Sequence, residues 1–207
     1  MGKRLLAGFL VMCLLLGGCS ADRGSSVSSG TEQDTYSELN QVQATEEPTE
    51  EELIKLVDQA MYDICDLAFN DMSIVLDNVF NGNIECDYSN QVIIDGISYQ
   101  WTSRQYSEIV DYYSQTFTGE PLDWILASRY MDVDGSLYAF AGGGATAVFC
   151  TVKSIEKLED NSYCATCQWP SGDSETYFSI QKTDAGYRIS SISYRPSILY
   201  LENLRED

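Results

Sequence analysis

The chain has 207 residues, with 12 Lys plus Arg against 32 Asp plus Glu, so its formal net charge is −20, and it contains no histidine. The lack of histidine excludes Ser-His and Cys-His catalytic pairs, zinc sites with imidazole ligands and histidine proton shuttles. An acidic chain without a Lys/Arg cluster repels phosphate, which argues against nucleic-acid binding. Hydrophobic residues make up 44% of the chain and aromatic residues 12%, which is enough to bury a core and predicts a globular domain.

Residues 1–18 have the pattern of a lipoprotein signal peptide. Lys3 and Arg4 precede an apolar run, Leu5 to Leu16, that is shorter than the roughly 20 residues needed to span a bilayer. Leu16-Gly17-Gly18-Cys19 resembles a bacterial lipobox. This resemblance implies cleavage after Gly18, diacylglycerol on the Cys19 thiol and anchoring to the extracytoplasmic face of the cell membrane. An ordinary signal peptide followed by a chance cysteine is the alternative.

Residues 19–48 are predicted to form an acidic, flexible tether. Their composition is dominated by Ser, Gly, Thr, Gln and Glu, and Tyr36 is their single aromatic residue, so they cannot build a core. A coil of about 30 residues spans on the order of 30 Å, and repulsion between its acidic side chains extends it further. Residues 49–207 are then expected to form one folded domain.

The first part of this domain is predicted to begin with helices. Thr49 and Glu52 form a capping box ahead of apolar residues at helical spacing, which predicts a helix over about 50–70. A second short helix or turn is expected over 73–80, before Asn81-Gly82 ends it.

A hairpin and two further helices follow in the prediction. Asp95-Gly96 lies between two apolar segments and suits a two-residue turn, because both positions accept positive φ. Thr102 and Gln105 form a second capping box, which predicts a helix from there to about Phe117. A shorter helix is expected after it, with Pro121 near its start, where the missing N–H costs nothing.

The second half of the domain is predicted to consist of strands. They are expected over about 130–133, 136–141, 146–156, 162–169, 175–182 and 186–194. Because every link between them is short, neighbouring strands should be antiparallel. Helices, a hairpin, a helix and then a meander together predict an α+β fold, with the helical face packed on one curved antiparallel sheet.

Five cysteines follow Cys19, namely Cys65, Cys86, Cys150, Cys164 and Cys167. Cys164 and Cys167 have the spacing of a redox motif, but residues three apart in a strand point to opposite faces. A hairpin around Asp160 brings Cys150 opposite residues near 167–169, so a Cys150–Cys167 disulfide is compatible with the register. Buried free thiols are the alternative. The odd number leaves at least one thiol unpaired within the chain. Neither a metal site nor a cofactor is expected.

One route to catalysis stays open from composition alone. A buried Asp could act with a Tyr as oxyanion donor, and the chain has 14 tyrosines. The alternative places the tyrosines at the edge of the core and the acidic residues on solvated faces, as for Asp111 and Asp123. No catalytic residue is assigned, and the chain is expected to be a binding protein.

The segment Ala141-Gly142-Gly143-Gly144-Ala145-Thr146 is the unusual local feature of the second half. Three glycines permit an extended backbone surface without side chains. The segment is not a phosphate loop, because it lacks a strand–loop–helix context and an adjacent Lys. Either it is a protruding recognition loop, or it is a glycine-rich bulge or wide hairpin connection.

Four segments in this order resemble secreted IseA-type DL-endopeptidase inhibitors of Gram-positive bacteria, over about residues 50–195. They are Ile94-Asp95-Gly96-Ile97-Ser98-Tyr99, the run from Tyr113 to Thr118, Asp134-Gly135-Ser136-Leu137-Tyr138, and Gly142-Gly143-Gly144. The resemblance implies a protein that is not an enzyme. It implies that a loop between two strands enters the catalytic groove of an NlpC-type cell-wall hydrolase, a role in which glycine and an adjacent acid matter.

In this chain the glycine element of that family is matched by Gly142, Gly143 and Gly144. The chain departs from the family because no acid lies inside the segment, and the candidate acids Asp132 and Asp134 come from the preceding hairpin. The implied partners are such a hydrolase and, through the lipid on Cys19, the membrane.

Two other interpretations remain open. The order of elements also fits a cone-shaped module of the nuclear-transport-factor-2-like type, with a small-ligand pocket lined by Trp101, Tyr113, Trp124 and Phe149. The chain could equally be a surface lipoprotein without a defined partner.

Overall fold

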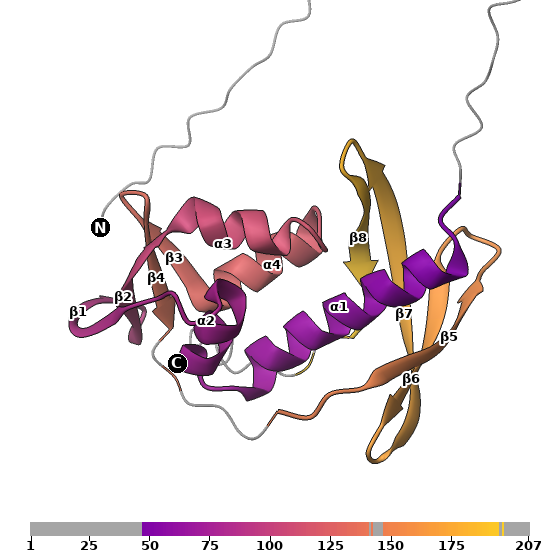
Figure 1. The fold of residues 1–207 in the computed structure, drawn as a ribbon, viewed down its shortest axis with the longest axis horizontal. Coiled ribbons are helices and arrows are strands. Elements are labelled where there is room, and N and C mark those ends of the chain that lie inside the picture. The colour runs from indigo at the N-terminus through magenta and orange to yellow at the C-terminus, as the bar shows by residue number, and fades with distance from the viewer. Residues whose placement is uncertain (1–46, 141, 143–146, 195, 197–207) are drawn as a thin grey trace, which may run out of the picture. The chain divides into compact units, whose positions relative to one another are not determined.

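The computed structural model describes residues 47–140, 142, 147–194 and 196, which belong to a compact unit formed by Glu46–Asp207. Figure 1 shows its helices and strands. The helices are α1 (Glu50–Phe69), α2 (Met72–Phe80), α3 (Tyr106–Tyr113) and α4 (Glu120–Arg129). The strands are β1 (Cys86–Ile94), β2 (Ile97–Gln105), β3 (Tyr130–Val133), β4 (Ser136–Phe140), β5 (Thr151–Lys157), β6 (Tyr163–Trp169), β7 (Gly172–Thr183) and β8 (Gly186–Ile192).

Helices α1 and α2 confirm the predicted helical start. The Thr49 backbone N–H donates to Glu52 Oε2 at 2.8 Å, and the Glu52 N–H donates to Thr49 Oγ1 at 3.3 Å, which is the predicted capping box. Helix α2 ends at Asn81, which adopts a left-handed conformation with φ 53°. None of the helices in the described ranges is long and apolar enough to cross a lipid bilayer.

The hairpin of β1 and β2 is confirmed, whereas the predicted helix start after it is wrong. Asp95 and Gly96 form the turn with φ values of 51° and 78°. Strand β2 continues to Gln105, and the buried Thr102 donates its hydroxyl to the Leu137 carbonyl oxygen at 2.9 Å. The β-branched Thr102 therefore belongs to the sheet. Helix α3 begins at Tyr106 instead, where Glu108 Oε2 accepts the Gln105 N–H at 2.8 Å.

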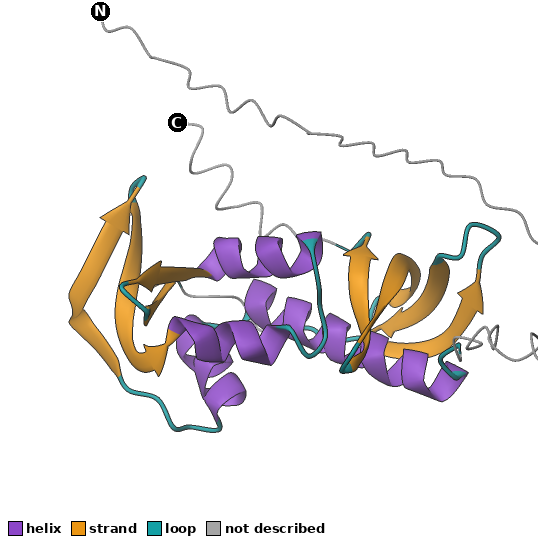
Figure 2. Ribbon diagram, turned by 90° about the horizontal axis from the view of Figure 1, so that it is seen from above, coloured by secondary structure: helices purple, strands orange, loops and turns teal. Residues whose placement is uncertain are grey.

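The α+β class is confirmed, but the strands form two sheets and not the single sheet that was predicted. One sheet has the order β1-β2-β4-β3 and the other β5-β6-β7-β8, with antiparallel neighbours throughout. Figures 1 and 2 show the two sheets at opposite ends of α1, with the helices between them. The link between β4 and β5 therefore leads from one sheet to the other, and it is not a hairpin connection.

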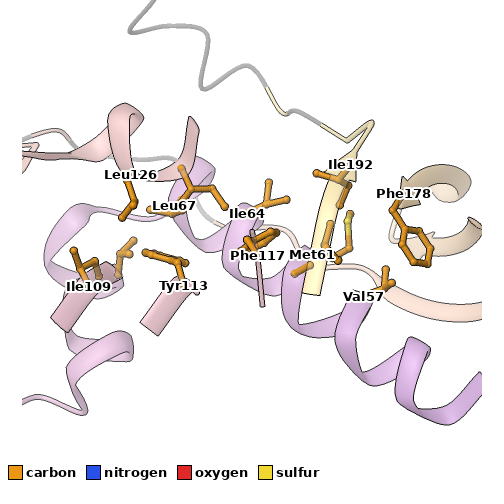
Figure 3. Packing of buried hydrophobic residues seen from close by; sticks show 14 of the residues in the cluster. Val57, Met61, Ile64, Leu67, Ile109, Tyr113, Phe117, Leu126, Phe178 and Ile192 are labelled. Atoms are coloured by element: carbon orange, nitrogen blue, oxygen red, sulfur yellow. The ribbon is translucent and has the colours of Figure 1, made fainter. Parts of the chain in front are cut away.

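The two sheets share one core. Its buried members on α1 include Val57, Met61, Ile64 and Leu67. Figure 3 shows this face of α1 with residues of α3 and α4 at one end and residues of β7 and β8 at the other. A smaller cluster around Tyr99 lies in the first sheet alone.

Candidate functional site

The structure does not bring the predicted binding residues together. Gly142 follows β4, whereas Asp132 and Asp134 lie before it, so the strand separates the acids from the glycine. Strand β4 has 5 residues and is therefore about 17 Å long. Asp132 Oδ1 accepts a hydrogen bond from the Gly135 N–H at 2.7 Å, so this acid stabilises the turn between β3 and β4. Cys19, Gly143 and Gly144 lie outside the described residues.

A basic residue that the sequence did not single out, Arg129, lies against the same ring as Gly142. The backbone of Gly142 approaches the Phe140 ring so closely that a Cβ at this position would overlap it. The Arg129 guanidinium lies over the same ring, 5.0 Å from its centroid. Within the described part of the chain Arg129 forms no ion pair, and its Nε has no hydrogen-bond acceptor. Partial burial lowers the pKa of the guanidinium but leaves it charged at neutral pH.

The aromatic pocket predicted for a small ligand is not formed by its expected residues. Tyr113 is buried in the large core, and its hydroxyl lies 3.0 Å from that of Tyr130. Phe149 is 39% exposed and stacks on Tyr62 with 5.0 Å between ring centroids. Trp101 packs against the smaller cluster of the first sheet, away from Tyr113. The expected pocket residues are therefore dispersed over two clusters and the surface.

A different hollow follows one face of α1 and has a volume of about 540 Å³, in the range of small-molecule sites. We call it the α1 cleft. It is lined by Pro48, Glu52, Leu53, Lys55, Leu56, Gln59, Asp63, Tyr112, Gln115, Thr116, Gly186 and Tyr187. The lining thus combines one helix face with the segment that follows α3 and with the β7–β8 turn. These elements are far apart in sequence, and only the folded unit assembles them.

Asp63 is the chemically distinctive residue of the α1 cleft. Its side chain is 3% exposed, and its Oδ1 accepts hydrogen bonds from Gln59 Nε2 at 2.9 Å and from the Tyr112 hydroxyl at 3.2 Å. Its Oδ2 accepts no hydrogen bond from any described residue. Burial raises the pKa of this carboxyl to about 7, with a smaller contribution from Asp66, against the lowering effect of the two donors.

The Asp63–Tyr112 pair differs from the catalytic arrangement left open by composition. The Tyr112 hydroxyl is occupied by Asp63, and burial together with the neighbouring carboxylate raises the pKa of the phenol. Tyr112 is therefore not a free oxyanion donor. What the pair offers is one unfilled carboxyl oxygen that can accept a hydrogen bond or a positive charge at neutral pH.

Cys150 and Cys167 are free thiols in this structure, so the predicted disulfide stays a prediction. The two thiols interact, which raises the pKa of Cys150 and lowers that of Cys167. Cys167 is buried whereas Cys164 is partly exposed, as expected for opposite faces of β6. A thiol with a lowered pKa beside a second thiol is a suitable starting point for disulfide formation.

We expect thiol–disulfide exchange with oxidised glutathione to join Cys150 and Cys167, with the two electrons passing to glutathione. The closed loop should stabilise the unit by about 3 kcal/mol. Mass spectrometry after alkylation should show two fewer reactive thiols. The Cys150→Ser variant should lose this change and the Cys86→Ser variant should keep it. Full alkylation of both cysteines after oxidant treatment would show that the pair does not close.

Among the described residues, no group of three Cys, Asp or Glu side chains is placed to hold a metal ion. Comparison of the chain with protein-family models, curated proteins and solved structures gave no significant match. Its function is therefore inferred from its own residues.

Proposed function

We propose that the chain is a lipid-anchored protein on the extracytoplasmic face of a bacterial membrane that binds and inhibits a cell-wall DL-endopeptidase of the NlpC type. The lipobox-like segment Leu16-Gly17-Gly18-Cys19 supports the anchor. The order of motifs shared with IseA-type inhibitors supports the partner class. The net charge of −20 supports it further, because an acidic protein is steered toward a basic hydrolase by its long-range field.

The observation that carries the proposal is that Gly142 and Arg129 each lie against the ring of Phe140. Glycine is needed at position 142 because a Cβ there would overlap the ring of Phe140. The adjacent guanidinium has no ion-pair partner among the described residues, although acidic residues dominate the chain. An arginine in this state can form a bidentate contact with a carboxylate of a partner. We call Gly142, Phe140 and Arg129 the glycine-arginine patch.

The inhibitor proposal is tested by titrating the soluble chain, beginning at Ser20, into a muropeptide hydrolysis assay with NlpC-type enzymes of the same organism. We expect inhibition at micromolar concentration. The inhibitory affinity of the Arg129→Gln and Gly142→Ala variants should be lower by about tenfold or more. Arg129→Gln removes the charged contact, and Gly142→Ala displaces Phe140. Lys153→Ala removes the same charge from a surface ion pair and should inhibit normally. A folded chain that does not inhibit at micromolar excess would refute the proposal.

The anchor is tested separately by fractionating cells. We expect the Cys19→Ala variant to leave the membrane fraction, because no thiol remains at the lipobox position to carry the lipid. Cys13 lies inside the apolar run of the signal segment, so Cys13→Ala is the matched control and should stay in the membrane fraction. The same membrane content for Cys19→Ala as for the unmodified chain would contradict lipidation.

A second candidate function is small-ligand binding without catalysis, as in nuclear-transport-factor-2-like modules. The α1 cleft favours it, with a volume of about 540 Å³ and a buried carboxyl in its lining. In this case Gln59→Trp should fill the cleft and abolish any rise in unfolding temperature that a ligand produces. A ligand that stabilises both proteins equally would place its site elsewhere.

A further inference from the structure

Asp63 is a buried carboxyl whose charge no side chain balances. The ion pairs of the described residues, Arg104–Glu108, Lys153–Asp173 and Lys157–Glu47, lie elsewhere. Gln59 and Tyr112 both donate their hydrogen bonds to Oδ1, and no described residue donates to Oδ2. Oδ2 is not among the fully buried atoms that lack a hydrogen-bond partner, and Asp63 lines the α1 cleft, so a ligand there can reach this oxygen. A positive donor placed against a largely buried carboxylate would gain binding free energy.

We propose that the α1 cleft binds a small molecule with a protonated primary amine and an apolar body, and that the ammonium group lies against Asp63. This inference rests on the second candidate function and names its ligand class. It does not depend on hydrolase inhibition. An ammonium group is compact and carries three donors, so one can occupy Oδ2 while the existing bonds to Oδ1 remain.

The rest of the cleft fits the apolar body and the orientation of such a ligand. Leu56 and the Tyr187 ring, both partly buried, provide apolar lining. Lys55 and Asp63 are eight residues apart on one helix, which places them about 12 Å apart along the axis. Glu52 lines the same end of the cleft one turn before Lys55, so the two opposite charges offset each other and the Asp63 end is the part of the cleft that favours a cation.

The charged and titratable groups around Asp63 also favour a cation. Asp66, one turn further along α1, is 3% exposed and adds negative potential. The cleft lining adds the oppositely charged pair Glu52 and Lys55. The other titratable groups that interact with Asp63 are tyrosines of α1, α3 and β3, namely Tyr62, Tyr112, Tyr113 and Tyr130, and burial raises the pKa of each. They are uncharged at neutral pH, so they neither neutralise Asp63 nor repel an ammonium. Amine affinity should rise as the pH passes from 6 to 8 and Asp63 ionises, and then level off.

The test uses the soluble chain from Ser20, with n-hexylamine as the probe and n-hexanol as its neutral match, at pH 8. The backbone NMR chemical shifts of Gln59, Tyr112 and Tyr187 should change as hexylamine is titrated in. The affinity for hexanol should be at least about tenfold lower than that for hexylamine. Asp63→Asn should reduce hexylamine affinity to the level of hexanol. Asp111→Asn removes an equal charge from the exposed side of α3 and should bind normally.

The outcomes separate this inference from the function on which it rests. Equal affinity for the two probes, or hexylamine binding that Asp63→Asn leaves unchanged, would overturn the amine assignment while retaining ligand binding in the cleft. If neither probe shifts any cleft residue, the amine assignment is refuted, and the Gln59→Trp comparison decides separately whether the cleft binds any ligand. The muropeptide assay reports on the inhibitor proposal independently.

Discussion

The Asp63→Asn substitution is expected to stabilise the folded unit by about 4 kcal/mol at pH 8 and by almost nothing at pH 3. The carboxyl of Asp63 has a pKa of about 7 in the folded unit, against 3.8 when it is fully solvated. Each pKa unit corresponds to about 1.4 kcal/mol. Below pH 3.8 the carboxyl is protonated in both states, so it contributes no difference. As the pH rises to 7 it ionises first in the unfolded chain, which lowers the free energy of unfolding.

Asparagine removes this loss because it has no charge to desolvate, and its Oδ1 can still accept from Gln59 and Tyr112. The measurement is urea denaturation of both proteins at intervals between pH 3 and pH 8. The difference between their unfolding free energies should grow between about pH 4 and pH 7 and then stay constant. Asp111→Asn, on an exposed position of α3, should give a small difference without this profile. A difference independent of pH would mean that Asp63 does not titrate near neutrality.

The Phe117→Ala substitution is expected to lower the free energy of unfolding by about 3–5 kcal/mol, the range for emptying a fully buried aromatic site. Phe117 is 0% exposed and lies between α1 and the second sheet (Figure 3). Its segment also extends that sheet, because the Thr118 N–H donates to the Ile189 carbonyl at 2.9 Å and the Ile189 N–H donates to the Thr116 carbonyl at 2.8 Å. The cavity would therefore weaken the packing of α1 on the second sheet and the hydrogen bonds between this segment and β8.

Urea denaturation at pH 7 would measure this effect, with Ile93→Ala as the control. Ile93 is 66% exposed on β1, so its truncation should change stability by no more than about 0.5 kcal/mol. Hydrogen exchange adds a second readout, since a shared core predicts that Phe117→Ala lowers protection in both sheets. Loss of protection in the β5–β8 sheet alone would show that the two sheets do not share their stability.

Local signals predicted most elements of the fold because they act over a few residues. The Thr49–Glu52 box and the Asp95-Gly96 turn each specify a start or a reversal without help from distant parts of the chain. The single-sheet prediction failed because short links show only that neighbours are antiparallel. They do not show where a ladder ends, and the break after β4 depends on how both sheets pack on α1.

The candidate sites were harder to predict because their residues are joined by tertiary contacts. Asp63 flanks the apolar stripe of its helix and is buried in the folded unit, where it accepts a hydrogen bond from Tyr112, 49 positions away. Its unsatisfied oxygen cannot be predicted from helical spacing. Arg129 is one of 12 basic residues, and nothing local to it indicates that it faces Phe140 or that no described acidic residue pairs with it. Gly142 and the strand that separates it from Asp132 were both predicted from the sequence, whereas the approach of Gly142 to the Phe140 ring was not.

The length of α1 fixes how far apart the chain's entry and the glycine-arginine patch lie. Gly142 lines a hollow with Asp71 and Met72, which follow directly after α1, whereas Pro48 precedes the first turn of the helix. A helix of 20 residues is about 30 Å long. If a partner binds at Gly142, α1 would keep it about 30 Å from Pro48, where the described chain begins its first helix, and a helix is stiff enough to hold that spacing constant.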